Sequence, residues 1–252
     1  MSLLHTILSH WAPEEVDLLM CYHQQLDPSV ELLLAYGGPE TNFNKIGWRQ
    51  KVFIADPGLR GPTDRQNYCH WMRAATAWAR NRPELPDAVF FTETDHPMLR
   101  SDYGKELVRT LITSQCDFLG KWCSNRESSN SYFYLQYRDD PVLRQVLREA
   151  SGVDDSPIYE ALATGMLFRW SVLDRVVAQT IHIPVFTEVI IPSTVRALGY
   201  RLGCFDRHGD FMSAVRYRPN FLLDEATVAM RCNAWCCHPL KEPEAIPYLM
   251  GL

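Results

Sequence analysis

The sequence predicts an α/β protein built on one mostly parallel sheet with helices on both faces. Short runs of apolar, β-branched and aromatic residues alternate along the chain with longer segments whose apolar residues recur at helical spacing, the order typical of this class. The 252 residues suit one large domain, and a composition of 46% hydrophobic and 22% charged residues is ordinary for a globular protein. We find no internal repeat, low-complexity segment or linker that divides the chain.

Five strands and three helices are expected through residue 122. In chain order they are a strand at 3–8, a helix beginning at Pro13, strands at 30–36 and 52–55, a helix capped by 62–64 and ended by 81–83, a strand at 88–91, a helix at about 102–113, and a strand at 116–122.

Local signals justify these elements. Pro13 stands in the first turn of its helix with Glu14 and Glu15 behind it, where acids complement the helix dipole. The helix after 62–64 has the clearest apolar stripe, formed by Tyr68, Trp71, Met72, Ala75, Trp78 and Ala79. The run 88–91 is apolar throughout, which is typical of a strand buried on both faces.

The second half is less regular. A helix is expected at 140–150, followed by a polar connection at 152–157. Residues 163–168 are interpreted as leading into a helix, and the run 186–192 precedes an amphipathic stretch that ends at Gly199.

Charge and composition limit the partners and the compartment. A formal net charge of −5 argues against broad capture of nucleic acid or of an anionic membrane. No apolar run approaches the roughly 18 residues that cross a bilayer, and residues 1–5 lack the features of a signal peptide. Eight cysteines without a small-scaffold pattern indicate reduced thiols, so a cytoplasmic location is expected.

The most informative motif is a pair of carboxylates at the end of a buried strand. Glu93, Thr94 and Asp95 follow the run 88–91, and Pro97 then stops regular pairing. Side chains two residues apart leave an extended segment on one face. Hard oxygen ligands suit Mg²⁺ or Mn²⁺, which in proteins usually bind substrate phosphates, so the expected partner is a nucleoside diphosphate. The alternative is two solvated acids in a loop.

A third acid is expected on the same rim of the sheet. Asp56 follows the strand at 52–55, and ligands of such sheets bind beyond the carboxyl ends of the strands. Asp56 therefore either contacts the base or ribose of a nucleotide or simply ends its strand at the turn formed by Pro57 and Gly58.

Glu188 has two interpretations. It is either a helix N-terminal carboxylate favoured by the dipole, or a buried carboxylate with a raised pKa that deprotonates an acceptor hydroxyl.

The tail carries Cys232, Cys236, Cys237 and His238, the atoms of a zinc site. Structural zinc usually takes separated pairs of ligands, whereas buried free thiols are common. His238 alone is therefore the expected ligand, an imidazole arriving from the carboxyl-terminal segment.

Several other motifs are missing. The sequence has no phosphate-binding Gly-x-x-x-x-Gly-Lys-Ser/Thr loop, no Gly-rich dinucleotide fingerprint after its first strand and no Gly-x-Ser-x-Gly elbow. Aromatic residues such as Trp71 and Tyr132 lie mostly at core spacing and carry little weight as carbohydrate contacts.

Taken together, these residues resemble the GT-A class of nucleotide-sugar-dependent glycosyltransferases. Glu93-Thr94-Asp95 is similar to the DXD motif of that class, which holds Mn²⁺ or Mg²⁺ on the diphosphate. Because Glu replaces the first Asp, Asp95 is the firmer ligand. His238 is similar in position to the late histidine that completes the metal shell, and 186–188 resembles the segment with the catalytic base of inverting members, reduced here to the single acid Glu188.

The resemblance also implies an organisation and a set of donor contacts. One domain, 1–252, would comprise a nucleotide-sugar half at 3–123, an acceptor half at 124–240 and a tail at 241–252. The residues implied to contact the nucleotide sugar are Asp56, Arg65, Thr94 and Gly165.

The implied activity is transfer of a sugar from a nucleoside-diphosphate sugar to a hydroxyl of a saccharide, lipid-linked or protein acceptor, with Mn²⁺ or Mg²⁺ on the diphosphate. Two alternatives remain open. A sugar-1-phosphate nucleotidyltransferase shares the sheet and the metal, but normally has a Gly-rich basic loop where this chain has 9–13. A catalytically inactive nucleotide-sugar-binding module would keep the fold and lose the chemistry.

Overall fold

A computed structural model describes residues 1–55, 69–125, 131–180 and 183–251. The strands are β1 (Leu3–Ser9), β2 (Glu31–Tyr36), β3 (Lys51–Phe53), β4 (Ala88–Glu93), β5 (Phe118–Gly120), β6 (Ser124–Asn125), β7 (Tyr159–Glu160), β8 (Met166–Arg169) and β9 (Leu202–Cys204). The α-helices are α1 (Pro13–Leu26), α2 (Glu40–Phe43), α3 (Cys69–Arg80), α4 (Tyr103–Thr113), α5 (Tyr132–Tyr137), α6 (Pro141–Ser151), α7 (Trp170–Thr180), α8 (Thr187–Ala197), α9 (Leu223–Arg231) and α10 (Ala245–Met250), and one 3₁₀ turn, η3, spans Phe205–Arg207.

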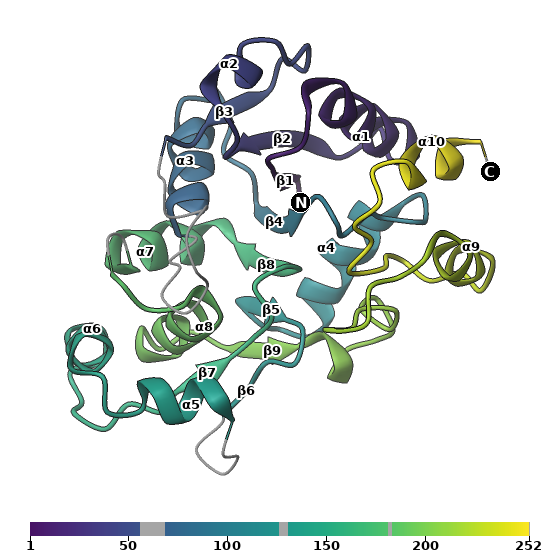
Figure 1. The fold of residues 1–252 in the computed structure, drawn as a ribbon. Coiled ribbons are helices and arrows are strands. Elements are labelled where there is room, and N and C mark those ends of the chain that lie inside the picture. Colours follow the sequence, from purple (N-terminus) through teal and green to yellow (C-terminus); the bar gives the residue numbers. More distant parts are fainter. Residues whose placement is uncertain (56–68, 126–130, 181–182, 252) are drawn as a thin grey trace.

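The described residues form a seven-stranded central sheet in the order β3-β2-β1-β4-β8-β5-β9 (Figure 1). Strand β1 pairs in parallel with both β2 and β4, and β5 pairs in parallel with β9. Strand β8 is antiparallel to its neighbours β4 and β5. The predicted α/β architecture with a mostly parallel sheet is therefore confirmed, with β8 as the strand that runs the other way.

The strand order reverses between β1 and β4. From β1 the chain builds outward through β2 to β3, and then returns to add β4 on the other side of β1. At such a switch point the two connecting segments leave in opposite directions, which opens a crevice beyond the carboxyl ends of the strands. In the register of the sheet, Leu8 pairs with Glu93 and Ser9 pairs with Tyr36, so the ends of β1, β2 and β4 reach the same rim.

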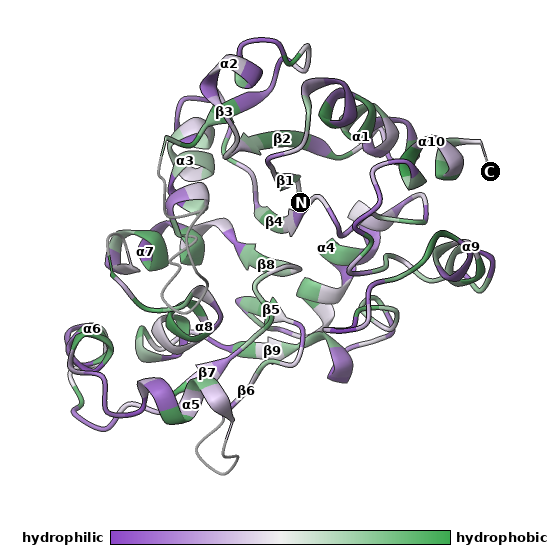
Figure 2. Ribbon diagram, in the orientation of Figure 1, coloured by the Kyte–Doolittle hydropathy of each residue, from purple (hydrophilic) through white to green (hydrophobic). Residues whose placement is uncertain are grey.

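The sheet is buried on both faces, because successive side chains of β1 alternate between two apolar clusters. Leu3 and Ile7 pack in a cluster with α1, α4 and α10, whereas Leu4 and Leu8 pack in a second cluster with α3, α7 and α8. Figure 2 shows the hydrophobic colouring concentrated on the central strands, while the helices carry both colours. This two-sided burial makes the strands continuous apolar runs in the sequence.

Several elements differ from the prediction. Residues 163–168 do lead into a helix, α7, but Met166–Arg169 forms strand β8, which was not predicted. Strand β9 and the short helix α2 were not predicted, and the strand predicted at 116–122 is shortened to β5. The predicted helix cap at 62–64 lies outside the described residues.

The two predicted halves share one sheet. Strands β8 and β9 belong to the segment 124–240 and are inserted beside β4 and β5, which belong to 3–123. Among the described residues, no helix is long and apolar enough to cross a membrane.

Candidate functional site

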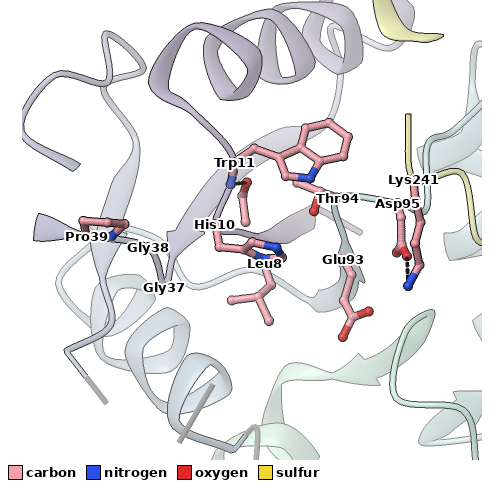
Figure 3. Close-up of a pocket in the computed structure, with 11 residues that line it drawn as sticks. Leu8, His10, Trp11, Gly37, Gly38, Pro39, Glu93, Thr94, Asp95 and Lys241 are labelled. Atoms are coloured by element: carbon pink, nitrogen blue, oxygen red, sulfur yellow. Dashed lines mark hydrogen bonds and ion pairs between the residues drawn. The ribbon is translucent and has the colours of Figure 1, made fainter. Parts of the chain in front are cut away.

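A pocket of about 660 Å³ opens at the rim where the strand order reverses. Its walls come from 8–11 at the end of β1, 37–39 after β2 and 93–95 at the end of β4. Lys241 completes the lining, and Figure 3 shows its amino group next to the carboxylate of Asp95. We call this cavity the switch-point pocket; its volume is within the usual range for small-molecule sites.

Glu93, Asp95 and His238 form a candidate metal site beside this pocket. Each side chain offers one ligand atom, and the three atoms lie within 4.8 Å of one another. They form the one group of this kind among the residues that the structure describes. Oxygen and imidazole nitrogen donors suit Mn²⁺ or Mg²⁺ better than a soft metal.

Backbone pairing brings His238 to Asp95 across 143 positions of sequence. The carboxyl-terminal segment lies along the chain that follows β4: the N–H of Leu240 donates to the carbonyl of Asp95 at 2.8 Å, and the N–H of Cys237 donates to the carbonyl of Pro97 at 3.2 Å. Met98 and Cys236 form an isolated antiparallel bridge in the same contact. The placement of the imidazole therefore depends on main-chain bonds rather than on a flexible side chain.

The His238 ring is oriented with a lone pair toward Asp95. Its Nδ1 lies 3.2 Å from the carbonyl of Arg216, which can only accept, so Nδ1 carries the proton. Burial lowers the pKa of His238, although the Asp95 charge opposes this; at pH 7 a pKa below the ordinary value of 6.5 leaves the ring neutral, with Nε2 as an acceptor. Nε2 lies 3.5 Å from Oδ1 of Asp95.

Asp95 consequently has a buried oxygen atom that a bound cation would stabilise. Its Oδ1 has no hydrogen-bond partner among the described residues, and it faces a second acceptor in His238 Nε2. Two acceptor atoms at this distance are favourable only with a positive charge or a proton near both. A divalent metal held by these two atoms fits the arrangement.

Lys241 adds a positive charge that the sequence analysis did not single out. Its Nζ lies 3.9 Å from Oδ2 of Asp95, and its side chain is 61% exposed (Figure 3). The signal available in the sequence was its position three residues after His238, which places both side chains in the segment that lies beside Asp95.

Glu93 is tied to the loop that precedes β8. Its N–H donates to Oγ1 of Thr164 at 3.1 Å, and the same hydroxyl lies 2.9 Å from Nδ1 of the buried His96. Burial raises the pKa of the Glu93 carboxyl, and the nearby charges of Asp95 and Glu188 raise it further, while Lys241 opposes them. A carboxyl group with a raised pKa beside other acids again indicates a site that favours added positive charge.

A second pocket, of about 640 Å³, shares Glu93, Asp95 and Lys241 with the first. It extends to Glu188, which lies in the first turn of α8, and we call it the Glu188 pocket. Burial raises the pKa of Glu188 to about 7, although the N–H of Ala163, which donates to Oε1 at 3.0 Å, opposes this shift. Glu188 is therefore a helix N-terminal carboxylate that is buried and lines a cavity, while its role as a base stays a prediction.

The remaining predicted donor contacts have different outcomes. Asp56 and Arg65 lie outside the described residues. Thr94 is buried and lines the switch-point pocket. Gly165 is absent from the described lining of both pockets; a Cβ there would lie 2.6 Å from Cε of Met212 at a φ of +79°, so packing and backbone conformation account for the glycine.

The cysteines of the tail form no metal site with His238 among the described residues. Cys236 and Cys237 are buried, and burial raises the pKa of both thiols. Cys236 donates to the carbonyl of Phe211 at 3.3 Å, and Cys232 is exposed. These residues are free thiols, the alternative that the sequence analysis favoured.

Comparison with known proteins gives distant structural likenesses alone. No family model and no curated protein matches the sequence. Among solved structures, the whole chain is similar to 95% of the galactosyltransferase LgtC in complex with donor and acceptor sugar analogs, at 10% identity and a TM-score of 0.47. An active-site mutant of LgtC matches over the same extent at 12% identity and a TM-score of 0.47.

A third solved structure is the bifunctional IspDF from Campylobacter jejuni. It matches 81% of this chain over 49% of its own length, at 9% identity and a TM-score of 0.42. Likenesses this distant leave the function to be inferred from the site itself.

Proposed function

We propose that the protein is a metal-dependent glycosyltransferase that moves a sugar from a nucleoside-diphosphate sugar to an acceptor hydroxyl. The observation that supports this best is the meeting of two pockets at one acidic group. The switch-point pocket and the Glu188 pocket have Glu93, Asp95 and Lys241 in common. Two substrates that enter from opposite sides would bring their reacting atoms together at these residues.

The donor would occupy the switch-point pocket with its diphosphate toward Asp95. Asp95 and His238 would hold Mn²⁺ or Mg²⁺ with help from Glu93, and the ion would neutralise the negative charge of the leaving diphosphate. Lys241 is placed to form a charge-assisted hydrogen bond with a phosphate oxygen, because its Nζ is near Asp95 and its side chain is exposed.

The acceptor would occupy the Glu188 pocket. Oε1 of Glu188 accepts from Ala163, which leaves Oε2 to take the proton of an acceptor hydroxyl. The acceptor oxygen would then form a bond to the sugar carbon while the bond from that carbon to the diphosphate breaks, with its electron pair leaving on the nucleoside diphosphate. A single in-line displacement of this kind inverts the configuration at the sugar carbon.

Calorimetry with UDP and with GDP, each with and without Mn²⁺, tests the proposal. We expect one of the two nucleotides to bind in the presence of Mn²⁺ and to be released by EDTA, because the diphosphate would be held mainly through the ion. Asp95→Asn should weaken metal-dependent binding by about 100-fold, the upper part of the range seen when partners of metal ligands are removed. Glu93→Gln should have the smaller effect.

The control for these variants is Glu242→Gln, an exposed acid that lines neither pocket. Nucleotide binding that is indifferent to both EDTA and Asp95→Asn would contradict the metal role. The products separate the alternatives: a nucleotidyltransferase releases pyrophosphate, a glycosyltransferase releases a nucleoside diphosphate, and an inactive binding module releases neither.

A further inference from the structure

The mouth of the Glu188 pocket carries exposed aromatic rings. Tyr132, at the start of α5, is 68% exposed, and Tyr217, in the segment before α9, is 60% exposed. Behind Tyr132, Phe133 stacks on Phe186 with ring centroids 4.6 Å apart, so this wall is held by packing. Aromatic faces beside a polar pocket suit the C–H face of a pyranose ring, whose hydroxyls then point to the polar groups.

Arg218 lines the same pocket and has no acidic partner within 4 Å among the described residues. Its guanidinium carbon lies 5.6 Å from the ring centroid of the neighbouring Tyr217. The carboxyl groups of Glu93, Asp95 and Glu188 also line this pocket, together with Lys241. Arg218 is therefore a positive charge set apart from the acids that would hold the metal and accept the proton.

Hydrogen bonds from Arg216 hold the backbone of the loop that carries Arg218. The guanidinium of Arg216 donates to the carbonyl of Pro219 at 2.7 Å, to the carbonyl of Asn220 at 2.9 Å and to the carboxylate of Glu225 at 2.7 Å. The N–H of Arg216 also donates to the carbonyl of His238 at 3.0 Å. Tyr217 and Arg218 thus project from a loop tied to the candidate metal ligand.

We propose that the acceptor is an anionic saccharide and that Arg218 binds its carboxylate or phosphate group. This inference rests on the glycosyltransferase function proposed above and names the substrate class of the Glu188 pocket. The sugar ring would lie against Tyr132 and Tyr217, its anionic group would meet the guanidinium, and the reacting hydroxyl would point inward to Glu188.

Paired ligands test the inference. Binding to the full chain, loaded with Mg²⁺ and whichever of UDP or GDP binds, is titrated by NMR with methyl β-D-glucopyranoside and methyl β-D-glucuronide, which differ only in the carboxylate. A second pair, methyl α-D-mannopyranoside with and without a 6-phosphate, separates carboxylate from phosphate recognition. We expect the anionic member of at least one pair to bind about tenfold more tightly, the effect of one hydrogen bond to a charged group.

Substitutions of Arg218 test whether this residue causes the preference for the anionic glycoside. Arg218→Ala should give the anionic and the neutral glycoside of each pair about equal affinity, and Arg218→Glu should make the neutral glycoside the tighter ligand. Nucleotide binding should be unchanged in both variants. Arg207→Ala, an exposed arginine outside both pockets, should keep the wild-type ratio. The inference is overturned if the nucleotide binds but neither pair shows a preference, if no glycoside binds, or if the preference survives Arg218→Ala. Failure of both nucleotides to bind with metal would instead overturn the proposed function, and the inference with it.

Discussion

Glu188 combines two features that a catalytic base needs. One carboxylate oxygen is fixed by the N–H of Ala163, so the group has a defined orientation. Burial raises its pKa to about 7, which makes it a stronger base than an exposed carboxylate and leaves a large fraction ionised near neutral pH.

Glu188→Gln should abolish sugar transfer and leave donor binding intact. The amide oxygen of Gln can still accept from Ala163, so the pocket keeps its shape, but an amide cannot take up the acceptor proton. The expected loss in turnover is about 10²- to 10⁴-fold, the usual contribution of general base catalysis. Nucleoside diphosphate release under saturating donor measures turnover, and calorimetry measures binding. Unchanged turnover would remove Glu188 as the base.

The pH dependence of the wild type should agree with this assignment. Turnover should rise with pH as Glu188 ionises and should fall about tenfold per pH unit below the pKa, since the neutral carboxyl cannot act as a base. Because a cation held by Asp95 favours the carboxylate, the break is expected at or below pH 7 when metal is bound.

At the scale of elements, the loop that enters β8 connects both pockets. Ala163 donates to Glu188, Thr164 accepts from Glu93, and the N–H of Gly165 donates to the carbonyl of Phe91 in β4 at 2.8 Å. The antiparallel insertion of β8 beside β4 therefore places Ala163 and Thr164 against the acids of the site, while Gly165 holds the loop to β4.

The stability of Gly165→Ala tests the role of this loop. The left-handed φ of +79° should cost about 1–2 kcal/mol for an L-residue, and the new methyl should displace Met212 at further cost. Gly199→Ala is the matched control, because Gly199 has a φ of +85° and nothing lies within 4 Å of its added Cβ.

Chemical denaturation should therefore show the larger loss of stability for Gly165→Ala, while calorimetry should show unchanged nucleotide binding. Equal losses in the two variants together with weakened nucleotide binding would mean that Gly165 instead contacts the nucleotide sugar, as the resemblance implied.

The long elements with a clear apolar pattern were predictable from sequence, and the short strands β8 and β9 were not. The apolar runs of β1, β2 and β4 and the stripe of α3 carry strong periodic signals because each is buried against a whole layer. Strand β9 has three residues and β8 has four, too few for a pattern to repeat. Their pairing comes from tertiary contacts, which a local reading of the chain does not contain.

The candidate site was predictable in part for the same reason. Glu93 and Asp95 lie at the end of a long buried strand, so their position in the sequence alone suggested that they lie at the rim of the sheet. Lys241 and Arg218 lie in irregular segments, and their places in the pocket lining depend on backbone bonds that the segment around His238 makes to the chain after β4 and to Arg216. Tyr132 looked like a core residue and is exposed at the mouth of the Glu188 pocket.

At the scale of the whole molecule, the face of the sheet covered by α1 and α4 holds buried histidines. His23 is 1% exposed, its Nδ1 has no hydrogen-bond partner among the described residues, and its ring lies 5.4 Å from that of His5. Burial lowers the pKa of His23 to about 3, and burial also lowers the pKa of His5.

We expect His23 to make the fold sensitive to acid. The unfolded chain takes up a proton near pH 6.5, whereas folded His23 stays neutral down to about pH 3, so its contribution is fully present above pH 6.5 and is lost as pH falls toward 3. The loss approaches about 1.4 kcal/mol per pH unit within that window.

His23→Leu isolates this contribution from the opposite slope of Glu93 and Glu188, whose raised pKa values favour the folded state at lower pH. Urea denaturation of both proteins between pH 7 and 5 should show the variant gaining stability relative to the wild type as pH falls. Parallel stability curves would contradict the assignment.

The insertion of β8 between β4 and β5 has a consequence for synthesis on the ribosome. Strand β4 is complete at Glu93, but the edge that β8 covers stays open until Arg169 has been made, and Phe90 and Phe91 lie in that strand. The nascent chain must therefore keep an apolar strand edge unpaired while more than seventy further residues are translated. His238 is made later still, so Asp95 meets its imidazole neighbour only after 143 further residues have been translated.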